Sequence, residues 1–392
     1  MNATALFEYG LAFLTLYVSV FFILLLLENR HVLKHNPKPS RYPPISIIIP
    51  AYNEEKSIAA TIESVLAAEY PNKKQIIVIN DGSKDSTLAK ARAFAKRGVL
   101  VLDQPNKGKG AALNNGLRHV NGELVVTLDS DSFIERNALM KLVGFFDDPT
   151  VGAVTSVMKV HEPRNTLQRL QRVEYLITVF NRRVLSFINS INVTPGPLSV
   201  FRRSVFDKVG GYDEHNILED QEMALRIQAA DYKIESSMEG VVYTKTPRTL
   251  RELVRQRVRW HRGGVRNLLK HYYLINPRYG DFGIVIMPLG ILSMLAIFVV
   301  IAISALTLLH RQPGLLEYGL SNFIYTFSPM HLLGVMIFLG TLAWTYVGIK
   351  SIDSETVNPL EILAYVIIYA PLITLFWLVT AFKEAKREKL RW

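Results

Sequence analysis

Four long apolar runs limit what this chain of 392 residues can fold into. They cover residues 5–27, 284–309, 330–350 and 360–382. A helix rises about 1.5 Å per residue, so about 20 apolar residues cross the roughly 30 Å hydrocarbon core of a bilayer. The middle of the chain is charged and mixed in composition. The sequence therefore predicts a folded domain that is held between membrane helices.

The charges beside these runs predict an orientation. Basic residues follow the first run, at Arg30, Lys34, Lys38 and Arg41. Positive charge gathers on the cytoplasmic side of membrane spans, so we expect the chain after residue 28 to be cytoplasmic. The first run lacks a basic start and a clear small-residue cleavage site, which favours an uncleaved anchor over a signal peptide.

The same rule conflicts with the basic tail, Lys383–Trp392. If all four runs cross the membrane, this tail ends outside, where positive charge is disfavoured. Either one run lies in the membrane interface, or a further span lies within residues 312–329. We therefore expect three to five spans, with four as the central number.

Net charge and cysteine content bear on partners. The formal net charge is +11, and no cysteine is present. The basic residues lie beside the apolar runs and within residues 249–275, where lipid headgroups and substrate phosphates are nearer partners than nucleic acid. The absence of cysteine excludes disulfides and thiolate metal sites. Membrane lipids are expected as partners, and nucleic acid is not.

Short apolar strands alternate with helical stretches between residues 45 and 156. The strands are predicted at Ile45–Ile49, Gln75–Ile79, Val99–Leu102, Leu124–Leu128 and Val151–Ser156, and the helices at 55–69, 84–97, 109–119 and 136–146. Apolar strands that alternate with helices indicate a buried, mostly parallel sheet. Ligands bind such sheets beyond the carboxyl ends of the strands, where the polar motifs of this chain lie.

Three polar motifs follow the first three predicted strands. In Pro50–Glu54, the Tyr52 ring can border a base and Glu54 can accept from ribose hydroxyls, although an acid at a helix start explains the motif equally. Asn80-Asp81-Gly82-Ser83 is by itself a turn signature. Asn106–Gly110 is rich in glycine and lysine, which suits either a phosphate or a simple helix start, and it is not a P-loop.

Asp129-Ser130-Asp131 directly follows the fourth predicted strand. Alternate residues of an extended segment share a face, so both carboxylates can approach one ligand. One can bind Mg²⁺ or Mn²⁺, which take oxygen ligands and leave positions for substrate phosphates. The other can reach the sugar or the ribose.

Two further motifs lie later in the chain. Glu219-Asp220 precedes a predicted helix over residues 221–230. The two acids either stabilise the N-terminus of this helix or provide Asp220 as a general base. One base suits a single in-line displacement at an anomeric carbon. Gln256-Arg257-Val258-Arg259-Trp260 lies on a basic amphipathic helix, whose arginines can bind a diphosphate or lipid headgroups. Trp260 can stack near an acceptor or anchor at the interface.

In their order and spacing, these motifs resemble glycosyltransferase family 2, in the membrane-bound branch that includes synthases of cellulose, hyaluronan and poly-N-acetylglucosamine. The resemblance covers residues 45–265. It implies an α/β fold: a GT-A-type, Rossmann-like nucleotide-sugar domain with a mostly parallel sheet, plus transmembrane and interfacial helices. The implied divisions are an anchor over 1–30, a cytoplasmic catalytic domain over 31–248, amphipathic interface helices over 249–280, and C-terminal membrane helices with a basic tail over 281–392.

The resemblance also implies roles for single residues. Glu219 and Asp220 are the implied catalytic acids, and Asp131 with Asp129 is the implied site for Mn²⁺ or Mg²⁺. The implied donor contacts are Pro50, Tyr52, Glu54, Asp81, Lys109, Asp129, Gln256, Arg257, Arg259 and Trp260. Pro195–Ser199 takes the place of the acceptor-side segment. The chain departs from the family at Thr244-Lys245-Thr246-Pro247, where many relatives carry Thr-Glu-X-Pro.

The expected function is inverting, metal-dependent transfer of a sugar from a nucleotide-diphosphate-sugar to a membrane-embedded acceptor. A polyprenyl- or dolichyl-phosphate-linked acceptor suits the small membrane part, because long-chain synthases of the family build a tunnel from more spanning helices. GDP-mannose is slightly favoured over UDP-sugars as the donor. A processive polysaccharide synthase is the alternative, and a receptor that binds the nucleotide-sugar without turnover is the third. The expected location is the cell membrane, with the catalytic domain in the cytoplasm.

Overall fold

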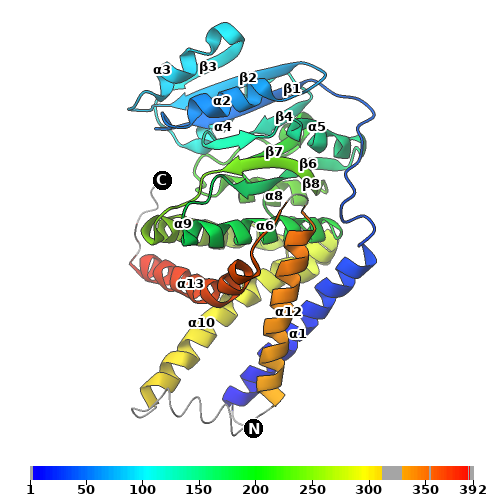
Figure 1. Cartoon of the computed structure of the whole chain (residues 1–392), viewed down its shortest axis with the longest axis vertical. Helices are drawn as coiled ribbons and strands as arrows, with labels where there is room; N and C mark the ends of the chain where they lie inside the picture. The colour runs from blue at the N-terminus through cyan, green and yellow to red at the C-terminus, as the bar shows by residue number, and fades with distance from the viewer. Residues whose placement is uncertain (1–2, 311–328, 353–354, 387, 389–392) are drawn as a thin grey trace.

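A mixed eight-stranded sheet forms the centre of the domain that lies above the long apolar helices in Figure 1. The computed structural model describes residues 3–310, 329–352, 355–386 and 388. The strands are β1 (Ile45–Ala51), β2 (Lys74–Asp81), β3 (Val99–Gln104), β4 (Leu124–Thr127), β5 (Ser132–Ile134), β6 (Val151–Val160), β7 (Ser199–Arg202) and β8 (Lys233–Thr244). Their order is β3-β2-β1-β4-β7-β6-β8-β5.

The first half of the sheet is parallel, and the second half is mixed. β3, β2, β1 and β4 run parallel to one another, and β6 runs parallel to β8. β7 is antiparallel to both β4 and β6, and β5 is antiparallel to β8. The predicted mostly parallel sheet is confirmed, and all five predicted strands are present. β5, β7 and β8 were not predicted.

Alternating side chains of β1 join two cores, one on each face of the sheet. Ile47 and Ile49 pack with Ile62 in one core, and Ile48 packs with Leu113 in the other. The strand is buried throughout because helices cover both faces. These helices are α2 (Ile58–Ala67), α3 (Thr87–Arg92), α4 (Lys109–Leu117), α5 (Ala138–Val143), α7 (Arg203–Val209) and α8 (Glu219–Ala229).

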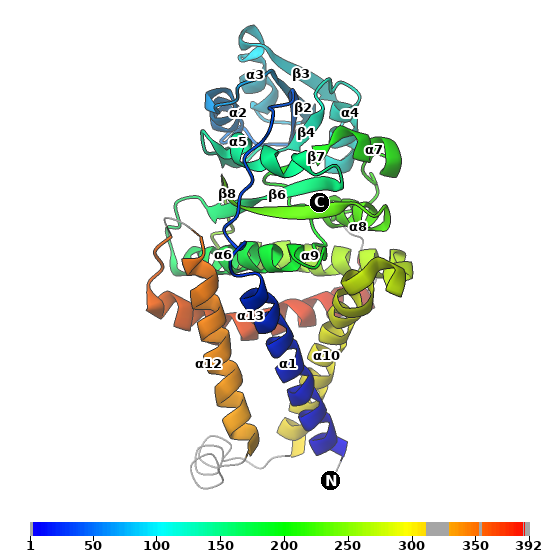
Figure 2. The same ribbon diagram turned by 90° about the vertical axis from the view of Figure 1, so that its right-hand side faces the viewer.

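Two long helices, α6 (Thr166–Ser186) and α9 (Leu250–Lys270), lie between the sheet and the long apolar helices (Figures 1 and 2). α9 begins with a capping box, in which Thr249 and Glu252 satisfy each other's backbone N–H groups. Short helical segments over Tyr272–Leu274, Pro277–Tyr279 and Phe282–Ile286 then lead into α10. The predicted basic helix is therefore present, and it is packed under the sheet.

Four helices in the described part of the chain are long and apolar enough to cross a membrane. They are α1 (Ala3–Glu28), α10 (Met287–His310), α12 (Pro329–Lys350) and α13 (Pro359–Ala385). In both views α1, α10 and α12 extend away from the domain, whereas α13 lies across them, beneath α6 and α9 (Figures 1 and 2). The four helices do not all share one direction.

Polar contacts hold α13 against α6 and α9 along its length. Near its start, Glu361 lies 3.9 Å from Arg169 of α6. In its middle, the Tyr369 hydroxyl donates to Glu174 of α6. At its end, Glu384 pairs with Arg262 of α9, which also donates to the Glu388 carbonyl. The alternative of a further span over residues 312–329 falls on residues that, apart from Pro329, lie outside those described.

Candidate active site

Eight of the predicted site residues line one cavity of about 530 Å³. They are Lys109, Asp129, Asp131, Glu219, Asp220, Gln256, Arg259 and Trp260. The charged end lies past the carboxyl end of β4, at the start of α4 and the start of α8. The other end is lined by Gly290 and Met294 of α10 and by Trp377 of α13. The cavity thus extends from the end of the sheet to the long apolar helices.

A lysine bridges two carboxylates at the charged end. The Nζ atom of Lys109 lies 2.6 Å from Asp129 and 3.0 Å from Glu219. These carboxylates raise the pKa of Lys109, although its burial opposes them. Gly196 passes so close that a Cβ atom there would lie 2.5 Å from Lys109 Nζ and 2.6 Å from Asp129. Any larger residue would push the bridge apart, so glycine is required at this close approach.

Asp131 is the carboxylate that best fits a divalent cation. Burial, together with the charges of Asp129 and Glu54, raises the pKa of Asp131 to about 7. Its hydrogen bond from Ser132 is 3.3 Å long, and no ion pair to it is found among the described residues. A bound cation would relieve this repulsion between carboxylates. Asp129 fits less well, because Lys109 already neutralises it.

The described residues contain no group of three or more His, Asp or Glu side chains that could hold a metal ion alone. A cation at Asp131 would therefore need oxygen ligands from elsewhere. Mg²⁺ is commonly bound by one or two carboxylates together with substrate phosphates. The residues present therefore fit Mn²⁺ or Mg²⁺ that arrives with a diphosphate.

Asp220 lies in the first turn of α8, where the backbone holds it in place. Its carbonyl accepts from the N–H and the hydroxyl of Thr194, and its carboxylate accepts from the Gln221 N–H at 2.8 Å. Burial and the charge of Glu219 raise the pKa of Asp220 to about 6. A carboxylate with a pKa near the working pH is suited to general base catalysis.

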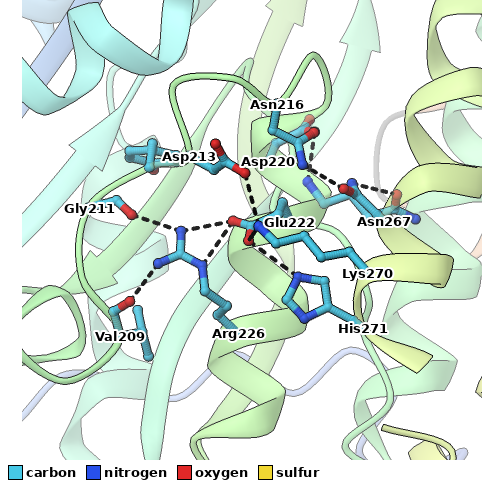
Figure 3. A network of polar contacts seen from close by, with 12 residues as sticks. Val209, Gly211, Asp213, Asn216, Asp220, Glu222, Arg226, Asn267, Lys270 and His271 are labelled. Carbon is cyan, nitrogen blue, oxygen red and sulfur yellow. Dashed lines mark hydrogen bonds and ion pairs between the residues drawn. The ribbon is translucent and has the colours of Figure 1, made fainter. Parts of the chain in front are cut away.

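A buried polar cluster around Glu222 fixes α8 against the end of α9 (Figure 3). The Glu222 carboxylate accepts from Arg226, from Lys270 at 2.8 Å and from His271 at 3.2 Å. Although burial alone would raise it, these partners lower the pKa of Glu222 to about 2. Asn267 of α9 adds a bond to the Leu218 carbonyl. The cluster thereby holds the start of α8, with Asp220, in register with α9.

Arg257 lies behind the cavity, and not in its lining. Its side chain is 4% exposed and lies 2.5 Å from Glu174 of α6. Its guanidinium carbon lies 4.0 Å from the centre of the Trp260 ring, a cation–π distance. Glu174 already neutralises the charge of Arg257, and a donor contact from Arg257 stays a prediction. In the structure Arg257 supports Trp260 from behind.

Four other predicted donor residues, Pro50, Tyr52, Glu54 and Asp81, also lie outside the lining of this cavity. Asp81 is buried, and its carboxylate accepts from the N–H groups of Lys107 and Gly108 at 2.9 Å each. It therefore holds the lysine loop against the end of β2. Glu54 lines a neighbouring cavity, and Tyr52 is exposed. Donor contacts from these four residues stay predictions.

Several side chains of the site lie outside the sequence motifs and were not predicted. Glu174 and Arg182 both come from α6, and Arg182 lines the cavity. The only signal in the sequence is that this helix mixes charged with apolar residues. Lys245, where the resemblance implied an acid, also lines the cavity and brings a positive charge to its wall.

Residues 46–210 match the sequence profile described as Glycosyl transferase family 2. Over these residues the chain is similar to family 2 glycosyltransferases. A poly-beta-1,6-N-acetyl-D-glucosamine synthase from Staphylococcus epidermidis is 33% identical over 233 residues. The synthase of the same name from Staphylococcus aureus (strain COL) is 31% identical over 233 residues. Each alignment covers 58% of this chain and 56% of the relative, so the match spans about half the length of these curated proteins.

The chain is also similar to solved structures. One of them is the mannosyltransferase PcManGT from Pyrobaculum calidifontis, in complex with GDP-Man and Mn²⁺. The match has a TM-score of 0.59 and 20% identity, and it covers 98% of this chain and all of that one. At this identity the likeness concerns the fold alone. The expected GT-A-type fold is confirmed.

Proposed function

We propose that this chain is a membrane glycosyltransferase that moves a sugar, with inversion, from a nucleotide-diphosphate-sugar to a lipid-linked acceptor. One observation carries the proposal. A single cavity runs from Asp131 and Asp220 to Met294 and Trp377 on helices that are apolar enough to enter a bilayer. Such a cavity suits a polar donor at one end and an acceptor that stays in the membrane at the other.

In the proposed reaction each residue has one task. Asp131, with Asp129 nearby, would hold Mn²⁺ or Mg²⁺, which neutralises charge on the diphosphate when bound. Arg259 and Gln256 of α9 line the same wall and orient the donor. A protonated acceptor oxygen, of a hydroxyl or of a phosphate monoanion, attacks the anomeric carbon, and its proton passes to Asp220. The bond from that carbon to the diphosphate breaks, and the nucleoside diphosphate leaves.

The donor remains the open part of the proposal. GDP-mannose stays the first choice from the sequence, and UDP-N-acetylglucosamine competes with it because relatives with 31–33% identity are named poly-N-acetylglucosamine synthases. That name also supports processive synthesis as the second candidate function.

A donor and product assay tests the proposal. Purified protein is incubated with GDP-mannose, UDP-glucose or UDP-N-acetylglucosamine, with undecaprenyl phosphate, and with Mn²⁺, Mg²⁺ or EDTA. We expect one donor to give a lipid carrying a single sugar, and EDTA to stop the reaction. A ladder of high-mass products would instead favour the polymer synthase. Absence of nucleoside diphosphate release from every donor would refute both.

We further propose that α1, α10 and α12 cross the membrane and that α13 lies in its cytoplasmic interface. This arrangement would place residues 30–280 and the C-terminal tail on the same side. It would also remove the conflict with the charge of the tail, because three crossings leave Lys383 and Lys386 inside. The polar contacts of α13 with Arg169 and Arg262 support it.

Single cysteines can test this topology, since the chain has none of its own. Lys386→Cys and Lys84→Cys are both at exposed positions. In sealed vesicles we expect a membrane-impermeant maleimide to label both from the same side. If Lys386→Cys is labelled only from the side opposite to Lys84→Cys, α13 crosses the membrane and the in-plane arrangement is wrong.

A further inference from the structure

Four arginines of the described chain are buried, and one of them differs from the rest. Arg183 pairs with Glu235, Arg257 with Glu174, and Arg262 with Glu384. Arg182 is 3% exposed and forms no ion pair within the described residues. A buried charge is costly unless it is paired and hydrogen-bonded. The chain therefore retains at Arg182 a positive charge that its own acids do not neutralise.

The hydrogen bonds of Arg182 are also incomplete. Its Nη2 atom donates to the Ser156 carbonyl at 3.4 Å, which is a long bond, and its Nε atom has no partner. The neighbouring Arg183 shows what a structural role requires, because it donates to the carbonyls of Val32, Leu33 and His35. Arg182 thus keeps donor capacity for a group that enters the site.

Arg182 lines the catalytic cavity, together with Thr178 of its own helix and Asn192 of the next loop. Asp220 lines the same cavity, although the two form no ion pair. Burial lowers the pKa of Arg182 to about 10, and the charge of Asp220 opposes this shift. Arg182 therefore lines the cavity in which the acceptor is proposed to react.

We propose that Arg182 binds the phosphate group of a lipid-linked acceptor beside Asp220. This inference rests on the proposed function and assigns the acceptor an anionic class. The donor diphosphate would have other positive charges at hand, from the cation proposed at Asp131 and from Arg259, which lines the same cavity. A phosphate at Arg182 would complete its hydrogen bonds and match its charge. The lipid chain would then extend past Met294 and Trp377 toward the bilayer.

Three soluble probes separate the phosphate from the chain: farnesyl phosphate, farnesol and inorganic phosphate. Binding to purified full-length protein is measured for the wild type, Arg182→Gln and Arg182→Lys. We expect the wild type to bind farnesyl phosphate at least about tenfold more tightly than farnesol, the size of one charge-assisted hydrogen bond. Arg182→Gln should lose this preference, and Arg182→Lys should keep part of it.

Arg169→Gln is the matched control, because Arg169 lies on the same helix with its side chain 55% exposed. It should leave the preference unchanged. In the transfer assay, Arg182→Gln should raise the KM for the lipid at least about tenfold and leave the KM for the donor unchanged. Substitution of a purely structural residue would change both KM values or neither.

Three outcomes would overturn the inference. The first is equal binding of farnesyl phosphate and farnesol by the wild type. The second is a rise in the donor KM of Arg182→Gln, which would assign the residue to the diphosphate. The third is inorganic phosphate binding as tightly as farnesyl phosphate, which would leave no role for a lipid.

The inference and the proposed function can fail separately. If the wild type releases nucleoside diphosphate from a sugar donor while Arg182→Gln keeps the phosphate preference, only the inference is wrong. If no donor is turned over, the proposed function is wrong, and the probe-binding result still decides the anion site. Should Arg182→Gln fail to fold, the Arg182→Lys variant and the comparison of probes on the wild type remain decisive.

Discussion

Asp220→Asn is expected to lower kcat by about 10²–10⁴, the usual contribution of a general base. The amide has the shape of the carboxylate and can keep the hydrogen bond from the Gln221 N–H, so the start of α8 should stay folded. It cannot accept a proton from the acceptor. Donor affinity should change little, and single-turnover kinetics with a separate donor-binding measurement check both parts.

The pH profile gives a second test of the same residue. The pKa of Asp220 is about 6, and the base must be deprotonated to act. Below about pH 6, kcat/KM of the wild type should therefore fall as the carboxylate gains its proton, and it should level off above that pH. The asparagine variant should lack this fall.

Asp231→Asn is the control for the same chemical change. Asp231 is exposed in its ion pair with Arg278, and its φ of +60° is one that asparagine tolerates well. It should turn over at the wild-type rate. Wild-type turnover by Asp220→Asn would instead remove Asp220 from the role of base.

Glu174→Ala is expected to destabilise the protein by about 3–5 kcal/mol, because it leaves the charge of Arg257 buried without an ion pair. For a domain of this size the loss corresponds to roughly 10 °C in Tm. It should also free the guanidinium that supports Trp260. Thermal unfolding in detergent measures the first effect, and the KM for the donor measures the second.

Glu63→Ala provides the comparison for this ion pair. Glu63 pairs with Arg97, and both side chains are about half exposed. Exposed ion pairs are typically worth about 0–1 kcal/mol, so the change in Tm should be small. If the two variants melt at the same temperature, the buried pair does not stabilise α6 against α9.

The charged end of the site could be predicted from the sequence because local patterns determine it. Apolar strands that alternate with helices place Lys109 and Asp131 at the same edge of a sheet. The structure brings both to one cavity with Asp220 and Arg259. β5, β7 and β8 were missed for local reasons too. β5 and β7 are only three and four residues long, and β8 mixes polar with apolar positions.

The support behind the site could not be predicted, because it depends on residues far apart in the chain. Arg257 and Glu174 are separated by 83 positions, and no sequence pattern near either residue indicates that the two pair. Hydropathy likewise measures the length and polarity of a helix, and says nothing of its direction. α13 is as apolar as a span, and only its contacts with Glu174 and Arg262 reveal that it lies across the others.

The hydrogen bonds of Tyr369 join α13 to both members of the buried ion pair. If α13 lies at the depth of the lipid headgroups, lateral pressure in the bilayer would act on α13. Its contacts would pass that force to Glu174 and Arg257, and from Arg257 to the ring of Trp260. Thinner or more loosely packed membranes would shift that helix, and the rate of sugar transfer would change with them. The activity of such an enzyme would depend on the thickness and packing of the lipid around it.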